Sequence, residues 1–173
     1  MQEIKLTPAS YIVLGLVAYL GEATPYALKQ MVQGSIGNFW SLQHAQLNTE
    51  PERLAKAGLL EEKRELEGRR RKRYSITPKG QEAVASWRHE PTGERGELRE
   101  PALLKLFLGG DAAELAPLHV ESHRHQLAEY EAIRAGMPAD VPQGPRQALE
   151  AGIRHEQTWI AFWGELAGSR SSE

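Results

Sequence analysis

The sequence contains no cysteine among its 173 residues. This absence excludes disulfides, thiolate metal sites and cysteine nucleophiles, and it is compatible with a reducing compartment, so we expect a cytoplasmic protein. An excess of charge of one sign is lacking too, because 21 Lys and Arg face 23 Asp and Glu and leave a formal net charge of -2. Any affinity for a polyanion must therefore come from positive charge that is placed locally.

Apolar stretches long enough to cross a bilayer are also missing. The stretch YIVLGLVAYL at residues 11–20 is shorter than the roughly 20 residues that a spanning helix needs, and it is typical of a buried helix. The first ten residues lack a basic run followed by a long apolar stretch, so we expect no secretory signal and no membrane partner. A composition of 40% hydrophobic and 25% charged residues predicts a folded chain of one domain with an appendage, or of two small domains.

Catalytic motifs are absent as well. The chain has no G-x-S-x-G elbow, no phosphate-cradling glycine loop and no H-E-x-x-H pair. Four closely spaced carboxylates fall on a predicted exposed ribbon, where no apolar pocket is expected to raise their pKa values. They are Glu61, Glu62, Glu65 and Glu67. We therefore predict that the protein is not an enzyme and needs no cofactor.

Turning to what is present, two Thr-Pro pairs predict helix starts. In Thr7-Pro8 and again in Thr24-Pro25, a hydroxyl that can cap is followed by a proline suited to the first helical position. Gly21 is expected to end the first of these helices. The segment between the second helix and the next element contains Phe39 and Trp40, which we expect to pack in the core.

A third helix and a two-stranded ribbon follow. The third helix is predicted within residues 41–60, with Gly58 as its stop. The segments 59–67 and 69–76 then predict a β-hairpin around Gly68. A fourth helix after the hairpin completes the order of a winged helix-turn-helix domain, so the fold class is mainly α.

This domain, residues 1–90, has a physical fit to DNA. The third helix matches the width of a major groove, and the ribbon next to it can reach the backbone. A basic run at the predicted ribbon tip is suited to phosphate oxygens, because guanidinium groups pair with them in a planar fork. The run comprises Arg69, Arg70, Arg71 and Lys72. The alternatives are a solvated turn paired with glutamates across the hairpin, a localisation signal or a heparin-like site.

Five polar residues in or near the third helix are candidates for DNA contact. Gln46 is the best candidate for a base edge, since its amide can pair with adenine. Ser41 is favoured as the helix cap over a DNA contact. His44 is either a phosphate donor or a plain surface histidine. Asn48 and Arg53 complete the set.

Several motifs together resemble the PadR family of bacterial transcriptional regulators. They are LTPASYIVLGL at residues 6–16, then NFWSLQHAQL, AGLLE, the basic hairpin, YSITPKG and LLKLFLGG, and they extend over nearly the whole chain. The resemblance implies an N-terminal winged helix, a C-terminal helical dimerisation region and repression relieved by a small molecule. It also implies double-stranded DNA as a partner.

The third helix departs from the family pattern. Asn48 replaces a common tyrosine, Thr49 a proline and Pro51 a core leucine, so the family's operator preference is not carried over. A proline within a helix loses one hydrogen bond, which predicts either a kinked helix or a restart near that residue. We favour the kink, because the apolar residues around it still fit one element. The positions that match the family are Gln46, Leu47, Glu50 and Leu54.

Residues 91–173 predict a helical region for dimerisation and effector binding. A linker rich in Glu, Gly and Pro precedes a helix capped by Asp111 and a final helix over 146–167. Two helices folded on each other are not expected to cover both of their apolar stripes, so a second copy of the chain is the expected partner. Such a homodimer would read a pseudo-palindrome. The stripe residues are Leu115, Leu118, Leu127, Tyr130, Ile153, Ile160 and Trp163.

Aromatic and histidine side chains in this region leave alternatives open. Trp159 and Trp163 are expected in the dimer core, or alternatively around a small aromatic effector. His119 and His123 share a helix face, but no third ligand is evident, so we favour a solvated face and predict no metal. For the chain as a whole, the alternative function is a winged-helix module that docks an acidic protein without specific DNA binding.

Overall fold

The chain forms two compact units. The computed structural model describes residues 4–64 and 71–168. The first unit is Met1–Glu94 and the second is Arg95–Glu173. The predicted fold class is confirmed, since helices predominate and the strands form one small sheet. Within the described ranges, no helix is both long enough and apolar enough to cross a bilayer.

Both predicted Thr-Pro helix starts are confirmed. The helix α1 runs over Pro8–Leu20, and α2 runs over Pro25–Gln33. Thr7 and Thr24 are the N-caps, and each side chain accepts a hydrogen bond from a backbone N–H in the first turn. Gly21 follows α1 with a φ of 75°, a left-handed value that glycine adopts without a Cβ penalty.

A single helix, α3 (His44–Lys56), lies where the third helix was predicted. Pro51 is inside it, so the alternative of a restart at this proline is wrong. Gly58 ends the segment with a φ of 73°, as predicted. Ser41 is not the cap; Gln43 holds that position, and its N–H donates to the Gln46 side chain over 3.1 Å.

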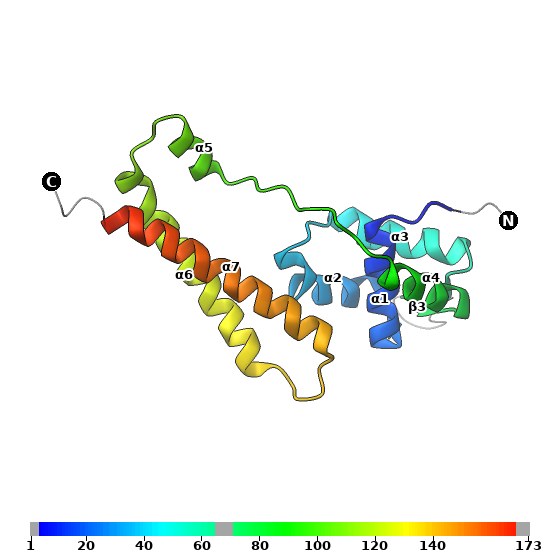
Figure 1. Ribbon diagram of the computed structural model, residues 1–173. Helices are drawn as coiled ribbons and strands as arrows, with labels where there is room; N and C mark the ends of the chain where they lie inside the picture. The colour runs from blue at the N-terminus through cyan, green and yellow to red at the C-terminus, as the bar shows by residue number, and fades with distance from the viewer. Residues whose placement is uncertain (1–3, 65–70, 169–173) are drawn as a thin grey trace. The chain divides into compact units, whose positions relative to one another are not determined.

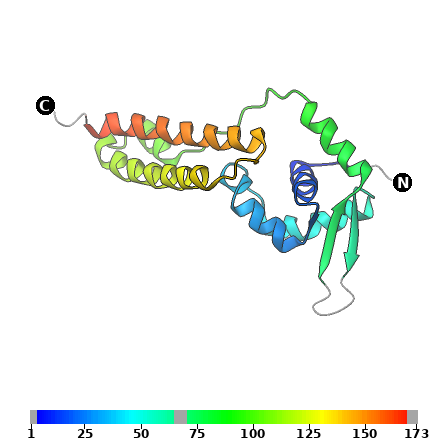
Figure 2. The same cartoon turned by 90° about the horizontal axis from the view of Figure 1, so that it is seen from below.

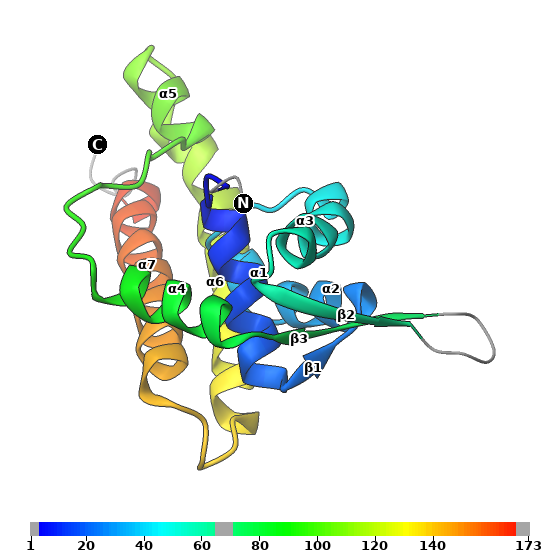
Figure 3. The ribbon, with the colours of Figure 1, turned by 90° about the vertical axis from the view of Figure 1, so that its right-hand side faces the viewer.

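The predicted hairpin is confirmed, and a third strand joins it. The strands β2 (Leu60–Arg64) and β3 (Lys72–Ile76) pair antiparallel, and β1 (Glu22–Ala23) pairs with the other edge of β3. Figure 2 shows β2 and β3 as two long neighbouring arrows, and in Figure 3 they extend past the short β1. The two long strands form the wing, and the fourth helix, α4 (Pro78–His89), follows at once.

The core of this unit joins the helices to the wing. Its fully buried side chains include Leu14 and Val17 of α1, Leu54 of α3 and Tyr74 of β3. Burial of such apolar surface is the main favourable term in folding. The wing is therefore anchored to the core by Tyr74, the residue opposite Glu62 and Ala23 in the sheet.

The prediction that Phe39 and Trp40 lie in the core is wrong. Their side chains are 66% and 45% exposed, next to the short 3-10 helix η1 (Ile36–Asn38). In this segment it is Ile36 and Leu42, on either side of the two aromatic residues, that pack against the core. Both aromatic side chains therefore stand on the surface just before α3.

The second unit contains a short helix and two long ones. They are α5 (Pro101–Phe107), α6 (Ala112–Gly136) and α7 (Gln143–Gly168). The long helices α6 and α7 lie side by side along their length (Figure 1). Asp111 caps α6 as predicted, since its carboxylate accepts from the Ala113 N–H over 2.8 Å.

The apolar stripes of α6 and α7 cover each other more fully than expected. Trp163 and Ile153 of α7 are 0% and 1% exposed, and Tyr130 of α6 is 7% exposed. A Cβ on Gly152 would lie 3.0 Å from the Tyr130 ring, so the ring packs directly on the α7 backbone. The expectation that these three side chains need a second chain to cover them is therefore wrong, because they are buried within the single chain.

Candidate nucleic-acid interface

Helix α3 has one buried face and one exposed face. Leu47, Pro51 and Leu54 are buried and fix the helix on the core of its unit. Because residues three and four apart share a helix face, the opposite side presents a connected, mostly polar surface. Its exposed members are Ala45, Asn48, Thr49 and Lys56, and Glu52 is half-buried among them.

The predicted site residues of α3 take different roles. His44 and Asn48 are exposed, His44 in the first turn and Asn48 on the outward face. Gln46 is exposed too, but its Oε1 accepts the Gln43 N–H, so the amide is partly used in closing the helix start. Ser41 is exposed in the segment before the helix.

Arg53 is engaged within the protein. Its guanidinium contacts the Glu50 carboxylate at 2.6 Å and 2.9 Å, the Ser10 hydroxyl at 2.9 Å and the Lys5 carbonyl at 3.3 Å. Burial by itself raises the pKa of Glu50, but hydrogen bonds with Arg53 and Ser10 outweigh burial and hold this pKa below its ordinary value. The arrangement ties α3 to α1 and its preceding segment.

The predicted basic run has several different environments. Arg69 and Arg70 lie outside the described residues. Arg71 is exposed. Arg73 of β3 pairs with Glu22 of β1 at 3.2 Å. Lys72 contacts two carboxylates, as expected if the basic run pairs with glutamates of the hairpin. One of these carboxylates, however, comes from outside the hairpin.

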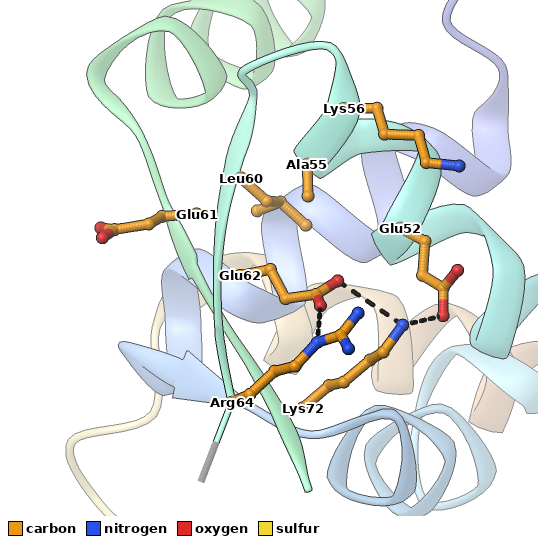
Figure 4. A pocket seen from close by; sticks show the side chains of 8 residues that line it. All are labelled: Glu52, Ala55, Lys56, Leu60, Glu61, Glu62, Arg64 and Lys72. Carbon is orange, nitrogen blue, oxygen red and sulfur yellow. Dashed lines mark hydrogen bonds and ion pairs between the residues drawn. The ribbon is translucent and has the colours of Figure 1, made fainter. Parts of the chain in front are cut away.

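That carboxylate belongs to Glu52 of α3, and the pair spans 20 positions of the sequence. Lys72 also lies 3.7 Å from Glu62 of β2. Figure 4 shows the three side chains converging in a groove of about 600 Å³ between α3 and the wing. Glu52 was not among the predicted site residues, although its position four residues after Asn48 places it on the same helix face.

The candidate effector residues form part of an aromatic cluster in the second unit. His119 stacks on Trp163 with ring centroids 4.9 Å apart, and His123 stacks on Trp159 at 5.9 Å. The Nδ1 of His123 lies 2.6 Å from the buried Glu156 carboxylate. The structure thus brings both tryptophans and both histidines together. The expectation of a solvated histidine face is wrong, because the side chains of His119 and His123 are only 29% and 15% exposed.

One polar atom of this cluster lacks a partner. The buried Nε1 of Trp163 finds no hydrogen-bond acceptor among the described residues. Burying a donor without an acceptor costs free energy, so the atom marks a place where an acceptor would be favoured. The described residues contain no group of three or more His, Asp or Glu side chains arranged to hold a metal ion.

Three helices that pack on one another, α1, α2 and α3, followed by a two-stranded wing and a fourth helix, have the arrangement of the winged helix-turn-helix class of proteins. Two family models match this chain. Residues 13–86 match the transcriptional regulator PadR-like family, and residues 98–167 match the virulence activator alpha C-terminal family. The PadR-like match lies within the first unit, so this unit resembles the PadR-like family of transcriptional regulators, in agreement with the predicted resemblance, and that family is one of regulators and not of enzymes.

Known proteins resemble the chain in sequence and in fold. The negative transcriptional regulator PadR of Bacillus subtilis (strain 168) is 28% identical over 101 residues, which are 56% of this chain and about half (54%) of that protein. The crystal structure of Bacillus subtilis PadR in complex with operator DNA has a TM-score of 0.81 at 19% identity, over 92% of this chain and 97% of that chain. The structure of Bacillus subtilis PadR in complex with p-coumaric acid has a TM-score of 0.78 at 17% identity, over 98% and 100%. Both structural matches establish a shared fold.

Proposed function

We propose that this protein is a homodimeric repressor that binds a pseudo-palindromic operator and releases it when a small aromatic effector binds. The observation that carries the DNA-binding part is the exposed polar face of α3 beside the wing. Asn48 and Thr49 lie on that face, and Arg71 is exposed immediately before β3. One helix of this width fits a major groove, and the adjacent arginine reaches phosphate oxygens.

The DNA-contacting residues differ in their proposed roles. Asn48 and Thr49 face base edges, and His44 and Arg71 face phosphates. Gln46 keeps its side-chain NH₂ for a base while its oxygen closes the helix start. Further phosphate contacts are proposed for Arg69, Arg70 and Ser41. Arg53 is omitted from this set because its guanidinium already has three protein partners.

A second copy of the chain is proposed to cover exposed apolar side chains of the second unit. Leu118 of α6 is 77% exposed, and Phe107 and Leu108 near the end of α5 are 86% and 75% exposed. Large apolar side chains that gather on a surface favour association. Leu115, Leu127 and Ile160, which are half-buried, remain proposed contacts at the edge of this surface.

The effector is proposed to bind at Trp159 and Trp163. The half-buried Trp159 ring provides flat contact area, and a ligand oxygen that reaches the buried Trp163 Nε1 would supply the acceptor that this donor lacks. Support comes from the p-coumaric acid complex of the Bacillus subtilis relative. An aromatic acid is therefore the first class of compound to test, by measuring whether it lowers DNA affinity and quenches tryptophan fluorescence.

DNA binding is tested by fluorescence anisotropy on a random duplex and on genomic promoter fragments at several salt concentrations. We expect a steeply negative slope of log affinity against log salt, and tighter binding to one fragment. Arg71→Ala should weaken binding to all fragments alike and make the slope shallower by about one, because one cation no longer meets a phosphate. Asn48→Ala or Thr49→Ala should instead change the preference among fragments.

The matched control is Arg124→Ala, which removes an exposed arginine from α6 in the second unit. Its affinity and slope should equal those of the unaltered protein. If Arg71→Ala also behaves like the unaltered protein, the wing does not contact phosphates. If the unaltered protein itself binds no duplex at low salt, the alternative of a winged-helix module that docks an acidic protein replaces the repressor.

A further inference from the structure

Lys72 at the start of β3 is held between two carboxylates from different elements. Its ammonium group contacts the Glu52 carboxylate of α3 and lies 3.7 Å from the Glu62 carboxylate of β2. The Lys72 side chain is 29% exposed, compared with 43% for Glu52 and 21% for Glu62. The Lys72 ammonium group is therefore largely shielded from solvent and lies beside two carboxylates (Figure 4).

The Glu62 side of this arrangement is fixed to the core. The Tyr74 hydroxyl donates to Glu62 Oε2 over 3.1 Å, and Arg64 donates to Oε1 over 2.8 Å. Burial, followed by the neighbouring Glu62 carboxylate, raises the pKa of Tyr74, so the hydroxyl remains a proton donor. Because Tyr74 is fully buried, its hydrogen bond fixes the position of the Glu62 carboxylate. The ion pair with Glu62 in turn fixes the position of the Lys72 ammonium group.

The Glu52 side of the arrangement faces outward. Glu52 lies on the same face of α3 as Thr49 and Lys56, the face proposed to enter a groove of DNA. A carboxylate there repels phosphates. Lys72 must break its contacts with both carboxylates before it can pair with a phosphate. The free energy lost with these contacts offsets the free energy gained from the phosphate contact.

We propose that Glu52 and Glu62 are specificity-determining residues, which clamp Lys72 and so lower the affinity of this protein for DNA of arbitrary sequence. Phosphate contacts supply essentially all of the binding that is independent of sequence. When Lys72 makes no phosphate contact, the side chains of α3 that face the bases contribute a larger share of the binding free energy. The inference rests on the proposed function, because it assigns a role in DNA binding to a contact seen in the protein alone.

The test compares Glu52→Gln with the matched control Glu61→Gln. Both variants remove one negative charge, and Glu61 is an exposed residue of the neighbouring strand β2 whose side chain points away from Lys72 (Figure 4). Binding to a random 20-base-pair duplex, a length chosen to span about two helical turns, is measured by anisotropy at several salt concentrations. We expect Glu52→Gln to raise the affinity about three- to tenfold at low salt and to steepen the salt slope by about one. Glu61→Gln should leave the slope unchanged.

A second measurement tests, without DNA, whether the two carboxylates hold the Lys72 amine. Reductive methylation followed by mass spectrometry gives the reactivity of each lysine amine in the full chain. Lys72 should react more slowly than the exposed Lys56, and Glu52→Gln should raise the reactivity of Lys72 severalfold while Lys56 stays the same.

The outcomes separate the inference from the proposed function. If the unaltered protein binds the duplex with a steep slope but Glu52→Gln and Glu61→Gln have equal slopes, the role of the clamp is refuted and the repressor proposal stands. If the unaltered protein binds no duplex, both fall. Equal reactivity of Lys72 in the unaltered protein and in Glu52→Gln refutes the clamp itself.

Discussion

The Nη2 of Arg53 donates a hydrogen bond of 2.9 Å to the Ser10 hydroxyl, joining α3 to α1 across 43 positions of the sequence. Ser10 is fully buried, and its hydroxyl also lies 3.1 Å from the Thr7 hydroxyl at the start of α1. The Glu50 carboxylate accepts from the Nε and from the same Nη2 of this guanidinium. The orientation of α3 in its unit therefore depends on a charged network as well as on apolar packing.

Glu50→Gln is expected to destabilise the first unit. The change removes the ion pair and leaves the Arg53 guanidinium short of an acceptor, which costs about 1–3 kcal/mol in the free energy of unfolding. Urea denaturation followed by circular dichroism measures this loss. The control Glu61→Gln, at an exposed position of β2, should change the free energy by less than about 0.5 kcal/mol.

The effect of Glu50→Gln should depend on pH in a defined direction. The folded-state pKa of Glu50 is lowered from its ordinary value of 4.5. A lowered pKa contributes stability that is fully present above pH 4.5 and is lost as the pH falls through the folded pKa. The difference between the unaltered protein and Glu50→Gln should therefore be constant from pH 6 to 7 and shrink below pH 4.5. A difference that grows on acidification would contradict the assignment.

His123 and Glu156 are expected to behave as a coupled pair in the second unit. The side chain of Glu156 is 9% exposed, so His123→Ala leaves a buried carboxylate without its partner and should cost about 2–4 kcal/mol. The double change His123→Leu with Glu156→Leu should recover at least half of this loss, because both polar groups are then gone. Urea unfolding monitored by tryptophan fluorescence gives the coupling, and additive losses would show that the two residues act separately.

Gly80→Ala is expected to loosen the contact between α4 and the wing. A Cβ at this position would lie 2.2 Å from the Leu59 carbonyl oxygen and 2.9 Å from Ile76 Cγ1, so the backbone must shift at a cost of about 1–3 kcal/mol or more. Gly15→Ala is the matched control, since a Cβ there meets nothing within 4 Å. In the middle of α1, that change should stabilise the protein by about 0.5–1 kcal/mol. Thermal denaturation separates the two directions.

Phe107→Glu and Leu118→Glu are expected to dissociate the proposed dimer. Both side chains are highly exposed in the single chain, so each change should leave the helical content unaltered while placing a charge in the apolar interface. Sedimentation at micromolar concentration should show the monomer for these variants and the dimer for the unaltered protein. Gln157→Glu adds the same charge at an exposed position of α7 and should remain dimeric. A concentration-independent monomer for the unaltered protein would refute the dimer.

Local signals in the sequence were sufficient for the four helices of the first unit, the hairpin and the two long helices, but β1, η1 and α5 were not predicted. The Thr-Pro pairs at residues 7–8 and 24–25 start helices, and Gly58 ends α3, because caps and stops act through neighbouring backbone groups. The hairpin and its basic run are equally local. The cap of α3 was assigned to Ser41 rather than Gln43, because a glutamine cap has a weaker signal than serine.

Side-chain exposure was predicted less well, because it depends on which residues occupy a given part of the core. Phe39 and Trp40 are large and apolar, but they are exposed, and the neighbouring Ile36 and Leu42 pack against the core. Trp163 was expected to face a second chain, and it is buried within its own unit. Neither result follows from periodicity, since periodicity identifies an apolar stripe without naming what covers it.

By itself, then, the sequence determined most of the helices, the wing and the resemblance to the PadR family, since these follow from short-range backbone chemistry and from motifs that can be read in order along the chain. Only the tertiary structure decided which charges meet. Lys72 finds Glu52 at a separation of 20 positions, and Arg53 finds Ser10 at 43. Pairing over such distances requires α1, α3 and the wing to pack first, because hydrogen bonds and close ion pairs form only between groups that are near each other in space, whatever their separation along the chain.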